Sequence, residues 1–259
     1  MRIHLESRYR KFVRDLPQTI LWCPGCGGHW RRKRTCTKCD GFGKLTKDSV
    51  QELVARVLVP RYRAKDSYFH GAGREDIDVR MLGRGRPFVF ELEGVRELDV
   101  GLATLHEEIN RRYAGRIEVD PFTQVPRARV PFWKEGRFAK IYRALVSAAA
   151  PLDVEPVRAL AGRVFRIEQR TPQRVAHRRG DLAREREVTV LAVEPVDEQW
   201  WSLDLRCEHG TYVKEWVSGD EGRTKPSLPD VLGVPCRCAE LDVLEILSDD
   251  TAPAAEALS

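Results

Sequence analysis

The stretch Phe69-His-Gly-Ala-Gly-Arg-Glu-Asp-Ile-Asp-Val-Arg-Met-Leu-Gly83 is followed by the run Phe88-Val-Phe-Glu-Leu92. The second run has the apolar spacing of a half-buried β-strand. The first run predicts an irregular loop, because its glycines allow close approach of the backbone and charges of both signs crowd around Asp76. A salt-bridged turn would contain the same residue types, so this loop alone does not assign a function.

Periodic segments surround the loop and the strand. Residues 49–58 predict a helix, since Ser49 and Glu52 form a capping box, apolar side chains repeat at helical spacing, and Pro60 would end it. A second helix is expected at residues 102–113, ending near Gly115. Further strands are expected at residues 140–146, 188–193, 201–207 and 241–247. Helices and strands interleave without βαβ regularity, which favours an α+β fold or a mixed sheet over a doubly wound domain.

Composition limits the class of protein. The 259 residues, 42% of them hydrophobic, can bury a core in one large or two modest domains. The N-terminus does not resemble a signal peptide and no eighteen apolar residues run together, so we expect a cytoplasmic protein without a membrane partner. The 44 Lys and Arg exceed the 39 Asp and Glu, and this net charge of +5 indicates a polyanionic partner only weakly.

Arginines concentrate in one region that contains no lysine. Their planar, multi-donor side chains suit RNA phosphates, although a solvated basic face would look the same. The eight arginines of this region are Arg163, Arg166, Arg170, Arg174, Arg178, Arg179, Arg184 and Arg186.

Four cysteines form two C-x-x-C knuckles, Cys23-Pro-Gly-Cys26 and Cys36-Thr-Lys-Cys39. Thiolates at this spacing predict a closed tetrahedral zinc site, and since no position is left for water, the zinc would be structural. Disulfide pairing is the alternative, which a cytosolic compartment disfavours. The glycines after each knuckle resemble the J-domain chaperone zinc region, but this likeness stops at the knuckles. His29 is expected at the surface or facing RNA.

Three further cysteines lie far from the knuckles. We expect them to be buried thiols or bystanders, with a second, weak metal site as the alternative. They are Cys207, Cys236 and Cys238.

Two later segments carry residues that suit the chemistry of an ionised carboxylate. Lys140-Ile-Tyr142-Arg-Ala144 places an aromatic ring on a predicted strand between cations. The segment from Cys207 to Glu215 joins a strand to a helix, where Lys214 and the helix N-terminus could keep a carboxylate ionised.

These segments, taken together, resemble a known family. Gly73-Arg-Glu-Asp76 is similar to the catalytic loop of pseudouridine synthases, Lys140-Ile-Tyr-Arg-Ala144 resembles their second motif, and Cys207-Glu-His-Gly-Thr-Tyr-Val-Lys214 resembles the third motif of the TruB-type enzymes. From about Leu16 to Leu247, the chain resembles the archaeal and eukaryotic tRNA pseudouridine synthase family that acts on T-loop uridines 54 and 55. Side signatures at residues 171–179, 219–226 and 241–245 complete the pattern.

The resemblance implies a pseudouridine synthase fold, with a central mixed, mainly antiparallel sheet flanked by helices, and an isomerase that needs no organic cofactor. It makes Asp76 the catalytic aspartate, with Tyr142 stacked on the target uracil and Lys214 paired with Asp76. Asp78 is a rival carboxylate that falls outside the motif spacing. Substrate-binding residues, implied by the motifs or expected from the arginine-rich region, are Arg74, Tyr212, Val213, Leu241, Arg174, Arg178 and Arg179.

The expected organisation is a small N-terminal zinc-binding module at residues 1–46, a catalytic domain at residues 47–247 and a disordered tail at residues 248–259. Family members commonly carry an N-terminal THUMP-type domain, so we expect a shortened form in which the basic residues 31–34 supply part of the RNA contact. The expected partner is tRNA, and the expected state is a monomer without an obligate protein partner. The alternatives are a pseudouridine synthase acting on another RNA and a non-catalytic RNA-binding or RNA-chaperone protein.

Overall fold

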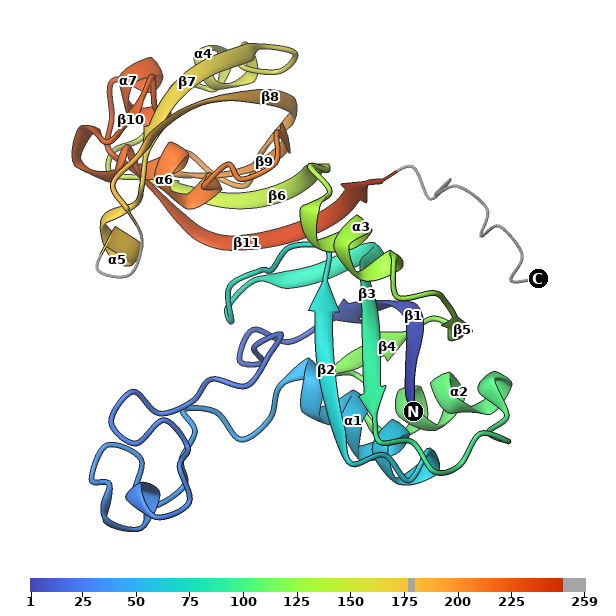
Figure 1. Ribbon diagram of the computed structural model, residues 1–259. Helices are drawn as coiled ribbons and strands as arrows, with labels where there is room; N and C mark the ends of the chain where they lie inside the picture. The colour runs from blue at the N-terminus through green and yellow to red at the C-terminus, as the bar shows by residue number, and fades with distance from the viewer. Residues whose placement is uncertain (177–179, 249–259) are drawn as a thin grey trace. The chain divides into compact units, whose positions relative to one another are not determined.

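The computed structural model describes residues 1–176 and 180–248, which form two compact units (Figure 1). The first unit comprises residues 1–136 and the second begins at Arg137. Each unit combines helices with strands, and every strand pairing described inside a unit is antiparallel. The α+β class and the predominance of antiparallel pairing are therefore confirmed.

The first unit is built on a sheet with the strand order β2-β3-β1-β4, in which β5 also pairs with β1. Its 3-10 turns are η1 (Arg32–Thr35) and η2 (Leu102–Thr104). Its strands are β1 (Arg2–Lys11), β2 (Asp66–Gly71), β3 (Arg80–Glu93), β4 (Ile117–Val119) and β5 (Thr123–Gln124). Its helices are α1 (Val50–Arg61), α2 (Leu105–Arg112) and α3 (Arg129–Glu135).

The strand predicted at residues 88–92 is the middle of β3. It pairs with β1 along one edge and with β2 along the other. Phe88, Val89 and Phe90 are all buried, so both faces of the strand are covered, whereas the spacing predicts one solvent-facing side. Phe69 of β2 stacks on Phe88 with ring centroids 4.8 Å apart, which adds aromatic packing to the core.

The helix predicted from Ser49 is α1, and Ser49 is its N-cap. The Ser49 Oγ accepts a hydrogen bond from the Glu52 N–H at 3.2 Å. Pro60 lies inside the last turn, and the helix ends one residue later than predicted. Pro60 has no backbone N–H to donate. The last turn is closed by the Tyr62 N–H, which donates to the Leu58 carbonyl at 3.0 Å.

The second unit contains a sheet with the order β10-β7-β8-β9-β6-β11. All four strands predicted for this part of the chain lie inside it, in β6, β8, β9 and β11. Its strands are β6 (Ala139–Ala148), β7 (Val164–Arg170), β8 (Ala183–Pro195), β9 (Trp200–Cys207), β10 (Thr224–Lys225) and β11 (Cys236–Leu247). Its helices are α4 (Val154–Arg158), α5 (Gln173–Ala176), α6 (Val213–Ser218) and α7 (Leu228–Leu232), with the 3-10 turn η3 (Asp220–Gly222).

The structure corrects the expected domain boundaries. Residues 2–11 pair along β3, so they belong to the sheet and not to a separate zinc module. Their buried apolar side chains alternate with His, Glu and Arg, which hides the strand in a polar composition. The segment expected to form one catalytic domain is divided between the two units after Gly136. Ser248, assigned to the tail, is buried, and residues 249–259 lie outside the described residues.

Candidate functional site

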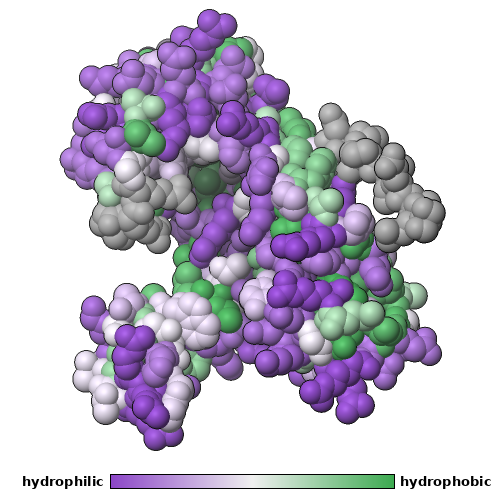
Figure 2. Space-filling model, viewed as in Figure 1, coloured by the Kyte–Doolittle hydropathy of each residue, from purple (hydrophilic) through white to green (hydrophobic). Residues whose placement is uncertain are grey.

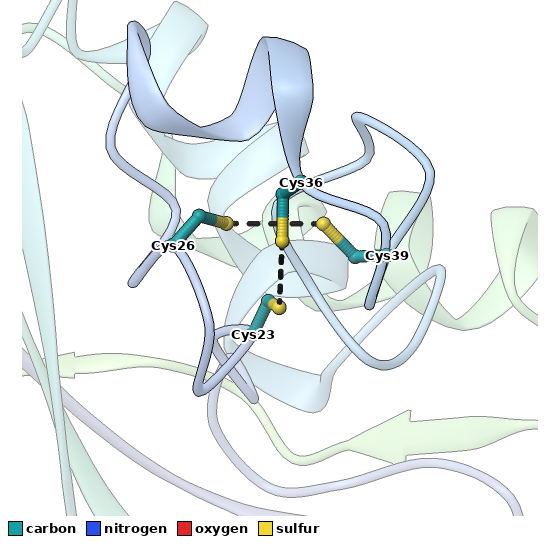
Figure 3. A group of neighbouring side chains, drawn as sticks. All are labelled: Cys23, Cys26, Cys36 and Cys39. Atoms are coloured by element: carbon teal, nitrogen blue, oxygen red, sulfur yellow. Dashed lines mark hydrogen bonds between the residues drawn. The ribbon is translucent and has the colours of Figure 1, made fainter.

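The four knuckle cysteines converge on one point, as Figure 3 shows. They lie in residues 22–44, hereafter the knuckle module, which a backbone bridge between Trp22 and Lys44 closes. The Sγ atoms are 3.7 Å apart for Cys23 and Cys36 and 3.8 Å apart for Cys26 and Cys39. All four Sγ atoms lie within 4.8 Å of one another, so the predicted cysteine cluster is confirmed as a group that could hold a metal ion.

These separations fit a tetrahedral metal. Four sulfurs around zinc, each at about 2.3 Å, lie about 3.8 Å from one another. A disulfide would need about 2.05 Å, so the spacing is that of metal ligands. Two backbone N–H groups, first that of Cys26 and then that of Gly25, lower the pKa of the Cys23 thiol to about 7. The Gly43 N–H donates to the Cys39 Sγ at 3.1 Å, so the turns also stabilise thiolates.

The three remaining cysteines lie outside the cysteine cluster. Burial raises the pKa of Cys207 to about 12 and that of Cys236 to about 11. The Cys238 thiol donates to the carbonyl of Glu240 at 3.3 Å. Within residues 1–176 and 180–248, the only group of three or more potential ligands is the cluster of knuckle cysteines, so no second metal site is formed there.

Asp76 lies in the segment between β2 and β3, residues 72–79, hereafter the Asp76 loop. Its neighbour Glu75 is buried and accepts a charged hydrogen bond from the Arg86 Nε at 2.8 Å. The Tyr9 hydroxyl donates to the same carboxylate, at 2.8 and 2.9 Å from its two oxygens. The Arg86 Nη1 also donates to the Ala72 carbonyl at 2.7 Å, so the pair ties the start of the loop to β3.

Lys11 holds the other half of the Asp76 loop. Its side chain is buried, and its Nζ donates to the carbonyls of Ile77 at 3.0 Å, of Asp76 at 3.3 Å and of Leu16 at 2.8 Å. Burial lowers the pKa of Lys11, while the Glu75 carboxylate, 4.0 Å away, opposes that shift. With its backbone held in this way, Asp76 is half-buried, whereas Arg74 and Asp78 are exposed.

Sequence reasoning missed four of the buried side chains that hold this loop: Tyr9, Lys11, Glu75 and Arg86. Three of them come from strands, and Glu75 belongs to the Gly73–Asp76 motif itself. The available signal was the alternation in β1, where Tyr9 and Lys11 occupy the same face as the apolar Ile3 and Leu5. A lysine at a position that should be buried indicates a partner among carbonyls or carboxylates.

Tyr142 and Leu241 lie on one face of the sheet in the second unit. Tyr142 of β6 is opposite Val243 of β11, and Leu241 is opposite Ala144. Opposite residues and residues two apart share a face, so Tyr142 and Leu241 are diagonal neighbours. Leu241 is buried and Tyr142 is half-buried. The helix α6 packs on β11 and starts with buried Val213 and half-buried Lys214.

Tyr212 and Arg174 also lie together in the second unit. The Arg174 Nε contacts the Glu215 Oε1 at 2.5 Å, and its guanidinium lies 6.0 Å from the centre of the Tyr212 ring. Gln169 fixes the backbone of Tyr212, because its amide nitrogen donates to the Tyr212 carbonyl and its oxygen accepts from the Tyr212 N–H. Gln169 and the buried Glu215 are positioning residues that the sequence analysis did not identify.

The arginine-rich region is mixed in charge. On β7, Arg166 is opposite Glu187 of β8, and Arg170 contacts Asp181 at 3.6 Å. Acidic side chains thus accompany the described arginines, and the choice between an RNA contact and a solvated face stays open. Arg178 and Arg179 lie outside the described residues.

The candidate residues are therefore divided between the two units. Asp76, Arg74 and the knuckle module belong to the first unit, and Tyr142 and Lys214 belong to the second. The pairing of Asp76 with Lys214 stays a prediction. Within the described residues, no helix is both long and apolar enough to cross a membrane.

Comparison with known proteins gives a family match over most of the chain. The family described as "Pus10, C-terminal" matches residues 4–247. A protein of Methanothrix thermoacetophila named tRNA pseudouridine synthase Pus10 is 42% identical over 245 residues, which cover 94% of this chain and 53% of the relative. Proteins of the same name from Methanothermobacter marburgensis and Korarchaeum cryptofilum are 44% and 41% identical, and 60% and 65% of their lengths are covered. The chain thus spans between half and two thirds of the length of these relatives.

Comparison with solved structures gave matches at low similarity. The archaeal box H/ACA sRNP Nop10-Cbf5 complex matches with a TM-score of 0.40 and 15% identity, covering 77% of this chain and 45% of the matched chain. A Cbf5-Nop10-Gar1 complex matches with a TM-score of 0.43 and 17% identity, covering 78% and 46%.

Proposed function

The chain belongs to the Pus10 family, and from this premise we propose that it is a tRNA pseudouridine synthase that isomerises T-loop uridine 54, uridine 55 or both. The observation that carries the proposal is the family match over residues 4–247, which contains every candidate catalytic and metal-binding residue. The curated relatives that share the match bear the name of that activity. The alternatives, another RNA substrate or RNA binding without catalysis, become outcomes of the test below.

The proposed reaction breaks the bond between the ribose C1′ and uracil N1, rotates the uracil, and joins its C5 to C1′. The C5 hydrogen leaves as a proton and N1 gains one, so the base keeps its composition and no redox partner is needed. The target uridine must leave its loop to reach the enzyme, at a cost of a few kcal/mol for unstacking. Side chains that stack on or surround the flipped base would offset that cost.

Asp76 is the proposed catalytic residue, acting on the ribose or the base through an ionised carboxylate. The buried Arg86–Glu75 pair and the Lys11 hydrogen bonds support this role, because they fix the backbone on both sides of Asp76 and leave its side chain half-buried. A fixed backbone reduces the freedom that the carboxylate would lose in the transition state. In the proposed site, Lys214 pairs with Asp76 and keeps it ionised.

The second unit would bind the flipped base and the RNA. Tyr142 would stack on the uracil, and the buried Val213 and Leu241 would line the pocket. Arg74, exposed at the start of the Asp76 loop, is a proposed phosphate contact. Tyr212 and Arg174, with Arg178 and Arg179, are proposed to bind the RNA backbone. The knuckle cysteines would hold zinc in a structural role, and the enzyme would work on tRNA as a cytoplasmic monomer.

The test is to map pseudouridine on a tRNA transcript incubated with the purified chain. Carbodiimide modification followed by primer extension should stop at position 54, 55 or both, and a transcript with cytidine at one position should leave only the other stop. Stops confined to other positions, or to other RNAs in a bulk RNA sample, would replace the T-loop with a different substrate. Tight tRNA binding without any stop would make the chain a non-catalytic RNA-binding protein.

A further inference from the structure

The knuckle module exposes three large aromatic side chains. Trp22, Trp30 and Phe42 are 53%, 55% and 50% exposed. Single exposed apolar residues are common, but three aromatic rings within one small module mark an interaction surface. Figure 2 shows the visible face of this lobe, at the lower left, with mainly hydrophilic and intermediate colours.

Trp22 is held in place before any ligand binds. Its backbone is bridged to Lys44, and the neighbouring Leu45 N–H donates to the Leu21 carbonyl at 2.8 Å. A Cβ atom at Gly28 would lie 2.2 Å from Cε3 of the Trp22 ring, which means that the indole lies against the bare backbone of this glycine. One part of the ring is therefore packed and the rest faces solvent. Such a ring loses little conformational entropy when a planar ligand stacks on it.

Cations accompany the rings. The guanidinium groups of Arg31 and Arg34 lie 4.7 and 5.5 Å from the centre of the Trp30 ring, and the Lys44 ammonium lies 5.2 Å from that of Phe42. The knuckle module contains six Lys and Arg and a single acid, Asp40, which gives +6 − 1 = +5. Four thiolates and one zinc ion would add about −2, so the surface stays positive when metal is bound.

We propose that the knuckle module is a stacking platform for unpaired RNA nucleotides, with Trp22 as its main stacking surface. It deepens the proposed function, on which it rests for the identity of the RNA, by assigning a second contact outside the isomerase site. Aromatic rings interleaved with cations fit bases and phosphates of a single strand. The core of a protein interface would instead be depleted of charge, which is the opposite of this surface.

The experiment measures binding of a twelve-nucleotide oligouridine to the zinc-loaded chain by quenching of tryptophan fluorescence. Trp133, Trp201 and Trp216 are buried, so a stacked base quenches chiefly the exposed indoles. Trp22→Ala should weaken binding at least about fivefold, the change that corresponds to about 1 kcal/mol, the lower limit for loss of one stacked base. Trp22→Phe keeps a ring and should bind within about twofold of the wild type.

The matched control is Leu98→Ala, which removes an equally exposed apolar side chain, 58% exposed, outside the module. It should leave the affinity unchanged, and zinc content should be one per chain in all three variants. Equal affinities of wild type and Trp22→Ala, or absence of quenching in the wild type, would overturn the platform and leave the surface to a protein partner. Pseudouridine mapping is independent of this result, since quenching without isomerisation would remove only the proposed function.

Discussion

Two irregular segments of the first unit, the Asp76 loop and the knuckle module, are ordered by opposite means. The loop is held by buried charged side chains of the neighbouring sheet: Arg86 binds Glu75 of the loop, and Lys11 donates to loop carbonyls. Within the module, the only buried residues are two of the cysteines and Gly43. The order of the loop is therefore coupled to the stability of the sheet, whereas we expect the order of the module to depend on the metal proposed for its four cysteines.

Removal of the metal by a chelator should cause the largest loss of order. It should disorder the knuckle module and leave the Asp76 loop ordered. Structural zinc contributes about 10 kcal/mol to the folding free energy of such sites. Chelation should abolish hydrogen-exchange protection at the Gly27, Cys36 and Phe42 amides, which bond within the module. The amides of Ala72 and Val79, which bond within or beside the Asp76 loop, should keep theirs.

Cysteine variants give the matched control for this experiment. Cys36→Ser should reduce bound zinc to well below one per chain, while Cys238→Ser should leave it unchanged because Cys238 lies outside the cluster. If protection of both segments disappeared together on chelation, the metal would be supporting the sheet as well, and the contrast between the segments would be lost.

Glu75→Gln should cause the next largest loss of stability. This loss should arise in the Asp76 loop and not in the knuckle module. It removes the charge that compensates the buried Arg86, and breaking a buried pair in this way costs about 3 to 5 kcal/mol. Urea unfolding should show that loss while zinc content stays at one per chain. Glu118→Gln breaks the half-buried pair between Glu118 and Arg10, and since Arg10 keeps Asp120 as a second partner, the change should cost no more than about 1 kcal/mol. Similar losses in the two variants would show that the buried pair has no special role.

Tyr9→Phe should have a smaller effect that depends on pH. It removes a hydrogen bond to the Glu75 carboxylate, worth about 1.5 kcal/mol at neutral pH. Burial, and then the Glu75 charge, raises the pKa of Tyr9 well above its ordinary value of 10.0. The folded state keeps a proton that the unfolded chain loses, so the stability from this group is complete below pH 10 and is lost as the pH rises further.

The variant should therefore lose stability less steeply than the wild type above about pH 10. Lys11 acts in the opposite sense, because burial lowers its pKa from 10.5, but it is present in both proteins and cancels in the comparison. Urea unfolding of the two proteins across this range measures the slopes. Parallel slopes would mean that Tyr9 titrates alike in the folded and unfolded chains.

The two segments also differ in how far the sequence predicts them. The cysteine spacing predicts the metal-binding cluster because all four cysteines lie within seventeen residues, 23–39. Thiolates at this spacing are typical metal ligands. The Asp76 loop can be located from its motif, but its support cannot, since Tyr9 and Glu75 are 66 residues apart and charged residues are ordinarily expected at the surface.

The same limit applies to the elements of the sheets. Apolar runs predict β3, β6, β8, β9 and β11, and Ser49 predicts the start of α1, because these signals are local. The polar residues of β1 conceal a strand that only its pairing with β3 explains. Tyr142 and Leu241 are each predicted on a strand, but their position on a shared face depends on the register between β6 and β11.

The role of Asp76 is tested most directly by tritium release from tRNA labelled at C5 of uridine, because formation of the new carbon–carbon bond expels that hydrogen. Asp76→Asn should reduce the rate at least about a thousandfold while the protein remains folded and bound to tRNA. Asp78→Asn, an equivalent change at the exposed carboxylate of the same loop, should leave the rate within about threefold. A wild-type rate in Asp76→Asn, or its loss only in Asp78→Asn, would contradict the assignment of Asp76.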